Sequence, residues 1–175
     1  MSRRVLFDTN FFSWFCDKKA SVDFTPDDDL DSLEKRFDFL LKDLDHDDSE
    51  IIIPAPVIAE VLCASTIDPR NVMKILNQEV RVRVVAFGQR AAEEFGQIFR
   101  KTHRGSENRN SFRFDLLIIA TAKAEGVDIV YSSDGGVINK CNAKQIRCYS
   151  FQKLPRPPFQ KQRDLQLDAH PDGIQ

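Results

Sequence analysis

Four acidic residues each lie next to an apolar segment of this chain: Asp8, Glu60, Asp115 and Asp134. Asp8 and Asp134 come after short apolar runs that are typical of buried strands. Glu60 and Asp115 lie within or before apolar runs that are typical of helices. Mg²⁺ and Mn²⁺ prefer oxygen ligands, and carboxylates that converge repel one another until a cation arrives. The pattern therefore predicts one oxygen-rich pocket that holds one or two of these ions.

Each acid taken alone has a simpler explanation. Asp8 can cap the helix that follows it, and Asp134 can be a turn residue before two glycines. Asp115 can favour a helix N-terminus, and Glu60 can face solvent. We prefer a shared pocket because all four explanations would otherwise have to hold at once. The apolar neighbours of Glu60 within residues 57–62 also predict a buried carboxylate, which needs a partner.

The elements that would position these acids alternate between strand and helix. Short apolar runs predict strands at residues 4–7, 50–54, 82–85, 128–132 and 146–151. Helical periodicity and capping residues predict helices after residue 11 and at 30–44, 56–62, 68–76, 88–101, 112–125 and 137–141, with a loop at 102–111. We therefore expect an α/β fold, a three-layer α/β/α sandwich around a central parallel five-stranded sheet. Ligands of such sheets bind at the carboxyl ends of the strands, where Asp8 and Asp134 are expected.

The 175 residues are enough for one domain with a sizeable core, which we place at residues 1–151. Residues 16–50 form an acidic, helical insertion with 13 Asp and Glu against 5 Lys and Arg. A lid or a dimer element are two interpretations of it, and a solvated helix is the default. Residues 152–175 are rich in proline and lack apolar periodicity, which is typical of a flexible tail.

Several other classes of protein are excluded or disfavoured by motifs that the chain lacks. The four cysteines form no C-x-x-C pair and the three histidines are distant from them in sequence, which argues against a zinc site. A phosphate-binding P-loop and a G-x-G-x-x-G dinucleotide motif are both absent. No apolar run is long enough for a membrane span or a signal peptide, so we expect no membrane association and a cytoplasmic location.

Residues 5–10, 57–60, 114–122 and 132–134, taken together, resemble a PIN domain, and within that family the VapC-like ribonuclease toxins. The resemblance covers residues 4–150. It implies that the four acids bind Mg²⁺ or Mn²⁺ and support hydrolysis of RNA by metal-activated water. It also implies that Ser132 and Asn10 help to arrange the site, that an antitoxin protein is a partner, and that the chain forms a homodimer.

Two alternatives to this endoribonuclease hypothesis stay open. A PIN fold can serve as a binding module for RNA or protein without catalysis, although retention of all four acids argues against that role. A DNA-directed nuclease of the flap type fits less well, because such enzymes usually carry more acids and a helical arch.

Basic residues precede Asp115 and predict a surface for the phosphate backbone of RNA. The charge is uneven along the chain, since residues 1–69 hold 7 Lys and Arg against 16 Asp and Glu, whereas residues 70–175 hold 18 against 11. The expected substrate-binding residues are Arg100, Lys101, Arg104, Arg109 and Arg113. The alternative is a solvated loop without a ligand.

Overall fold

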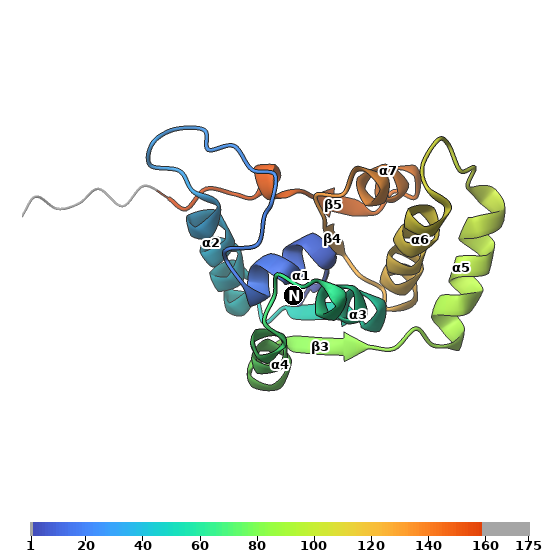
Figure 1. The fold of residues 1–175 in the computed structure, drawn as a ribbon, viewed down its shortest axis with the longest axis horizontal. Coiled ribbons are helices and arrows are strands. Elements are labelled where there is room, and N and C mark those ends of the chain that lie inside the picture. The colour runs from blue at the N-terminus through green and yellow to red at the C-terminus, as the bar shows by residue number, and fades with distance from the viewer. Residues whose placement is uncertain (1, 159–175) are drawn as a thin grey trace, which may run out of the picture.

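The computed structural model describes residues 2–158, and its centre is a five-stranded parallel sheet (Figure 1). The strand order is β3-β2-β1-β4-β5, and all four pairings are parallel. The α/β class and the five-stranded parallel sheet predicted from the sequence are confirmed. The strands are β1 (Arg4–Phe7), β2 (Glu50–Pro54), β3 (Val82–Val85), β4 (Ile129–Tyr131) and β5 (Arg147–Tyr149).

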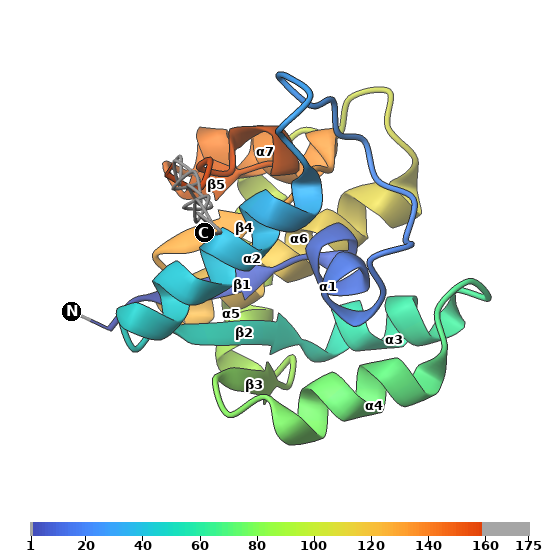
Figure 2. The same ribbon diagram turned by 90° about the vertical axis from the view of Figure 1, so that its left-hand side faces the viewer.

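Helices cover both faces of this sheet, which gives three layers. Helix α2 lies against one face, and α5 and α6 lie on the opposite face (Figures 1 and 2). The remaining helices pack around the carboxyl ends and edges of the strands. The helices are α1 (Thr9–Cys16), α2 (Leu33–His46), α3 (Ala55–Cys63), α4 (Pro69–Gln78), α5 (Gln89–Lys101), α6 (Arg109–Ala124) and α7 (Gly135–Ala143), followed by the 3₁₀ turn η1 (Phe151–Lys153).

The core is apolar along the central strands and aromatic next to them. Residues 5–7 of β1 are fully buried because a central parallel strand is covered on both faces. Aromatic rings then fill the space between β1, α1 and α2, and the rings of Phe11 and Phe151 stack with centroids 3.9 Å apart. Phe7 contacts Phe11, Phe37 and Tyr131 within the same cluster. This rigid base fixes the point at which β1 ends and α1 begins.

The chain order reverses at β1, and this places the candidate site. From β1 the chain first builds β2 and β3 on one side, and later adds β4 and β5 on the other. The crevice outside the carboxyl ends of β1 and β4 is therefore the switch point at which α/β sheets bind ligands. Asp8 directly follows β1, and Ser132 directly follows β4.

The largest differences from the predicted helix starts, three residues each, are in α2 and α6. Helix α2 starts at Leu33 and not at residue 30, because the Ser32 hydroxyl accepts a hydrogen bond from the backbone N–H of Lys35. Leu30 stays outside the helix and is 59% exposed. Helix α6 starts at Arg109 and not at residue 112, because Asn108 caps it. The loop before Asp115 is correspondingly shorter than expected.

The acidic insertion packs against the segment that follows β5. Arg36 on α2 is the centre of this contact, and its guanidinium donates to the carboxylate of Asp31 at 2.6 and 2.8 Å. The same group donates to the backbone carbonyls of Gln152 and Leu154 at 3.0 and 3.1 Å. Leu154 is buried. The first residues of the expected tail thus contact the insertion, and residues 159–175 of that tail lie outside the described part of the chain.

Within residues 2–158, every helix is too short or too polar to cross a membrane.

Candidate active site

A cavity of about 140 Å³ opens at the carboxyl ends of β1 and β4, and all four predicted acids line it. Asp8 comes from the end of β1, Glu60 from α3, Asp115 from α6 and Asp134 from the start of α7. Asn10, also singled out in the sequence, lines the same cavity. Residues that are up to 126 positions apart in the chain are therefore brought to one place by the switch-point topology.

Asp8 is held rigidly at the floor of the site. It is 2% exposed, and its Oδ1 atom accepts hydrogen bonds from the backbone N–H groups of Asn10 and Phe11 at 3.0 and 3.2 Å. Asp8 is thus the N-cap of α1, the simpler explanation considered from the sequence, and at the same time lines the acid cavity. Burial raises the pKa of Asp8 to about 7, against the hydrogen bonds from Ser132, Phe11 and Asn10, and the charge of Asp134 adds to the rise.

Asp115 and Asp134 meet around Gly136. Asp134 caps α7, and its Oδ1 atom accepts from the backbone N–H groups of Gly136 and Val137 at 2.7 and 3.1 Å. A Cβ atom added to Gly136 would overlap the Oδ2 atom of Asp115 and lie 2.9 Å from the Oδ1 atom of Asp134. Both carboxylates therefore surround a space that exists because residue 136 has no side chain.

Ser132 positions Asp134 and does not itself line the acid cavity. Its side chain is fully buried, and its hydroxyl accepts a hydrogen bond from the backbone N–H of Asp134 at 3.0 Å. Ser132 also hydrogen bonds to Asp8 through its side chain. One hydroxyl between two of the acids fixes the ends of β1 and β4 relative to each other.

Glu60 differs from the sequence expectation, because its side chain is exposed and not buried. The neighbouring Leu62 is also exposed, at 42%, so the apolar run of α3 does not surround the carboxylate. Only Val57 and Val61 of this helix are buried, because α3 is covered on a single side. Glu60 accepts a hydrogen bond from the Thr9 hydroxyl, which ties it to the start of α1.

Lys140 is a site residue that the sequence did not indicate. Its Nζ atom lies 2.9 Å from Asp115 Oδ2 and 2.8 Å from Glu107 Oε2, and its side chain is 7% exposed. Burial alone would lower the pKa of Lys140, but the hydrogen bonds to Glu107 and Asp115 outweigh it and raise the pKa. Burial also raises the pKa of Asp115, and Asp134 and Glu107 add to that rise although Lys140 opposes it.

The donor set suits a hard divalent ion, although the acids are not gathered as closely as ligands of a bound metal. Within residues 2–158, no three His, Cys, Asp or Glu side chains form a compact metal-binding group. Asp8, Asp115 and Asp134 nevertheless present carboxylates to a small space without an imidazole or thiol among them. The raised pKa values of Asp8 and Asp115 are the result of burial together with mutual repulsion, which a cation would relieve. The residues present therefore fit Mg²⁺ or Mn²⁺ better than Zn²⁺.

The predicted basic residues do not line the acid cavity. Arg104, Arg109 and Arg113 line a separate cavity of about 270 Å³, together with Phe99 and Phe112. Arg113 and Asp115 are two positions apart on α6, so their side chains point to opposite sides of the helix. Arg100 and Lys101 are exposed at the end of α5 and line neither cavity.

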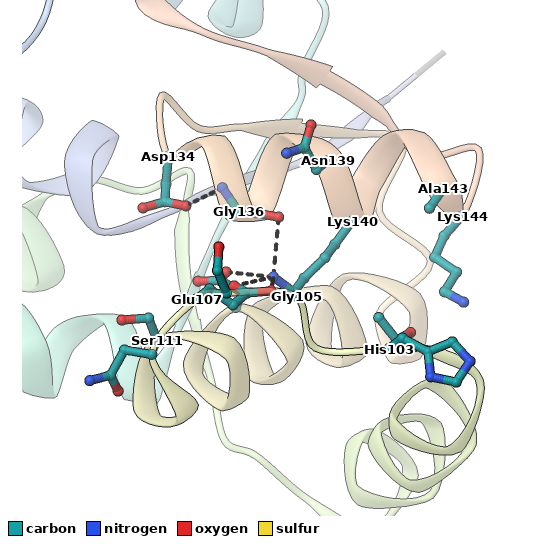
Figure 3. Close-up of a pocket in the computed structure, with 14 residues that line it drawn as sticks. His103, Gly105, Glu107, Ser111, Asp134, Gly136, Asn139, Lys140, Ala143 and Lys144 are labelled. Carbon is teal, nitrogen blue, oxygen red and sulfur yellow. Dashed lines mark hydrogen bonds and ion pairs between the residues drawn. The ribbon is translucent and has the colours of Figure 1, made fainter.

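A third and larger cavity, of about 590 Å³, adjoins the acids (Figure 3). It shares Ser111, Asp115 and Asp134 with the acid cavity and continues between residues 102–108 and α7. Its basic residues are His103, Lys140 and Lys144, and neither lysine was predicted to bind substrate.

Comparison with solved structures finds the same fold in toxin–antitoxin proteins. VapBC2 from Rickettsia felis, bound to a DNA fragment from its promoter, is 17% identical over 84% of this chain and 98% of its own, with a TM-score of 0.54. VapBC-1 from nontypeable Haemophilus influenzae is 12% identical over 85% and 98%, with a TM-score of 0.53. VapC20 from Mycobacterium tuberculosis, described as a toxin that cleaves the sarcin-ricin loop, is 14% identical over 77% and 93%, with a TM-score of 0.51.

A search of curated proteins finds no match to this chain. The family model described as the PIN domain, however, matches residues 5–141, which is most of the chain and includes all four acids. The resemblance seen in the sequence is confirmed, and the chain belongs to the PIN domain family.

Proposed function

We propose that this protein is a divalent-metal-dependent endoribonuclease. The observation that carries the proposal is the convergence of Asp8, Glu60, Asp115 and Asp134 on one cavity at the switch point of the sheet. A bound Mg²⁺ or Mn²⁺ ion supplies the activation of water and the neutralisation of charge that phosphodiester hydrolysis needs. RNA as the substrate is supported by membership of the PIN domain family and by the fold shared with the Mycobacterium tuberculosis toxin.

The protein's own groups supply position and charge. Asp8, Asp115 and Asp134 would hold the ion, and Glu60, at the open side of the cavity, would complete the set. Ser132 holds the Asp134 backbone and Lys140 holds Asp115, and these contacts restrain both carboxylates at the edge of the cavity. The helix N-termini behind Asp8 and Asp134 orient one oxygen of each acid and leave the other for a ligand.

We also propose an antitoxin partner, a homodimer and a cytoplasmic location. The neighbours from Rickettsia felis and Haemophilus influenzae are VapBC assemblies, which supports a toxin–antitoxin role for this chain. A small protein that covers the acid cavity would be the expected inhibitor.

A binding module without catalysis is the second candidate, and the Lys140 ion pairs favour it. Because Lys140 already neutralises part of the charge on Asp115 and Glu107, a cluster of acids can be stable here without a metal. The two candidates differ in whether a divalent ion binds and whether RNA is cut.

Gly136→Ala is expected to abolish tight Mn²⁺ binding and to lower RNA cleavage at least tenfold. The added methyl group would occupy the space between the carboxylates of Asp115 and Asp134 and push them apart. Gly135→Ala is the matched control, since nothing lies within 4 Å of a Cβ atom at that position. Calorimetric titration with Mn²⁺ and cleavage of single-stranded RNA measure both effects. Equal metal binding and cleavage by the two variants would refute the proposed site.

A further inference from the structure

The large cavity beside the acids has two ends of opposite charge. Asp134 and Ser111 lie at one end, and His103 and Lys144 lie at the other, as Figure 3 shows. The acidic end is shared with the candidate active site, whereas the cationic end is formed by the loop after α5 and the C-terminal end of α7. A ligand that fills this cavity must therefore present different groups to its two ends.

Lys140 separates the two ends and does not itself supply a binding charge. Its ammonium group donates to Glu107, to Asp115 and to the backbone carbonyl of Gly136, which uses all three of its protons. It also lies 5.1 Å from the centre of the Phe112 ring. These contacts join the 102–108 loop to α6 and α7, so Lys140 and Glu107 form a fixed pair that lines the middle of the cavity, between its two ends.

His103 and Lys144 keep their side chains available. Within residues 2–158, neither forms a hydrogen bond or an ion pair through its side chain. His103 is exposed and Lys144 is half-buried, and both lie at the same end of the cavity. Lysine and protonated histidine bind phosphate as point charges, and no carboxylate at this end competes for them, because Glu107 is already paired with Lys140.

We propose that His103 and Lys144 bind the phosphate group next to the scissile one in a single-stranded RNA, so that one nucleotide spans the cavity. The inference rests on the proposed ribonuclease function and adds a subsite to it. A volume of about 590 Å³ is within the range of sites that enclose a small ligand. Contacts to a neighbouring phosphate carry no sequence information, but they fix the register of the strand against the acids. The reacting phosphate is then held in place by its neighbour.

Binding of a single-stranded RNA octamer tests the subsite without cleavage when the chain carries Asp8→Asn. We expect that adding His103→Gln and Lys144→Gln to this variant weakens the affinity about tenfold. We also expect it to reduce the salt dependence of binding, since about one fewer counterion is released from the RNA. Lys42→Gln is the matched control, because Lys42 is an exposed lysine on α2, which covers the other face of the sheet. Fluorescence anisotropy at several salt concentrations measures both quantities.

Short probes show whether a phosphate is the group that binds. Competition with the dinucleotides ApA, pApA and ApAp should reveal a gain in affinity from one of the two terminal phosphates, and the His103 and Lys144 substitutions should remove that gain. If both terminal phosphates are without effect, or if the gain survives the substitutions, the subsite does not exist. Cleavage of RNA by the wild-type chain distinguishes the ribonuclease function from the phosphate subsite. If the wild type cuts RNA but a terminal phosphate adds no affinity, the subsite alone is refuted. A chain that neither binds nor cuts RNA refutes the proposed function as well.

Discussion

Asp8→Asn is expected to stabilise the metal-free protein at pH 8, by roughly 2–4 kcal/mol in the free energy of unfolding. The Asp8 carboxylate is buried and repelled by Asp134, so its pKa in the folded protein is raised to about 7, from 3.8 in the unfolded chain. Asparagine is nearly the same shape and is a good N-cap, so it should keep the hydrogen bonds from Asn10 and Phe11. The acid is therefore expected to cost stability in exchange for its role in the site.

The raised pKa of Asp8 also determines how the stability of the wild type changes with pH. Between about pH 4 and pH 7 the folded protein holds a proton on Asp8 that the unfolded chain has lost, so the wild type becomes less stable as the pH rises through this window. Below about pH 4 the opposite holds for Asp31, because the Arg36 hydrogen bond lowers its pKa and its stabilising effect is lost as the pH falls. Urea unfolding in EDTA from pH 4.5 to 8 measures how the free energy of unfolding changes with pH. Asp8→Asn should reduce this change.

Asp23→Asn provides the matched comparison, because Asp23 is an exposed acid in the insertion. Its substitution should leave the pH dependence of unfolding unchanged. An Asp8→Asn variant that is less stable than wild type at pH 8 would show that the charged Asp8 carboxylate stabilises the metal-free fold. It would contradict the destabilising effect of burial and of repulsion by Asp134.

Arg36→Met is expected to lower the free energy of unfolding by about 3 kcal/mol, the cost of leaving the partners of a buried ion pair without their donor. The Arg36 side chain is 3% exposed and that of Asp31 is 2% exposed. Methionine fills much of the same volume but cannot donate to Asp31 or to the carbonyls of Gln152 and Leu154. The insertion should therefore detach from the segment after β5, while the sheet and the acid site stay folded.

Two measurements separate this local effect from global damage. Denaturant unfolding gives the loss of stability, and limited proteolysis should cut residues 17–32 faster in Arg36→Met than in wild type. Arg90→Met on α5 removes an exposed arginine and should change the stability by less than about 0.5 kcal/mol. Equal stability and equal proteolysis in the two variants would mean that the insertion is held by other contacts.

The parts of the fold that depend on local patterns could be predicted from the sequence. The central parallel sheet of five strands follows from the alternation of strand and helix, and the four acids were found because each lies next to an apolar run. Helix starts were less accurate, since Ser32 and Asn108 cap helices at positions that apolar periodicity alone does not show. Both residues are good N-caps, so the signal was present in the sequence but weaker than the apolar pattern.

The parts that depend on tertiary packing could not be predicted. Lys140 lies 25 residues from Asp115 and 33 from Glu107 along the chain, and only the packing of α6 against α7 brings them together. Arg113 precedes Asp115 by two residues, yet the turn of the helix sends the two side chains to different cavities. Glu60 is exposed because α3 is covered on one side only, which its apolar sequence does not reveal.

Cleavage of a mixture of single-stranded RNA and DNA by the pure protein tests the central claim most directly. The assay compares Mg²⁺, Mn²⁺ and EDTA, and wild type with Asp8→Asn. We predict that the wild type cuts RNA only when a divalent ion is present, and that Asp8→Asn lowers the rate at least a thousandfold. RNA cleavage that persists in EDTA or in Asp8→Asn would contradict the account, and so would metal-dependent cutting of DNA alone.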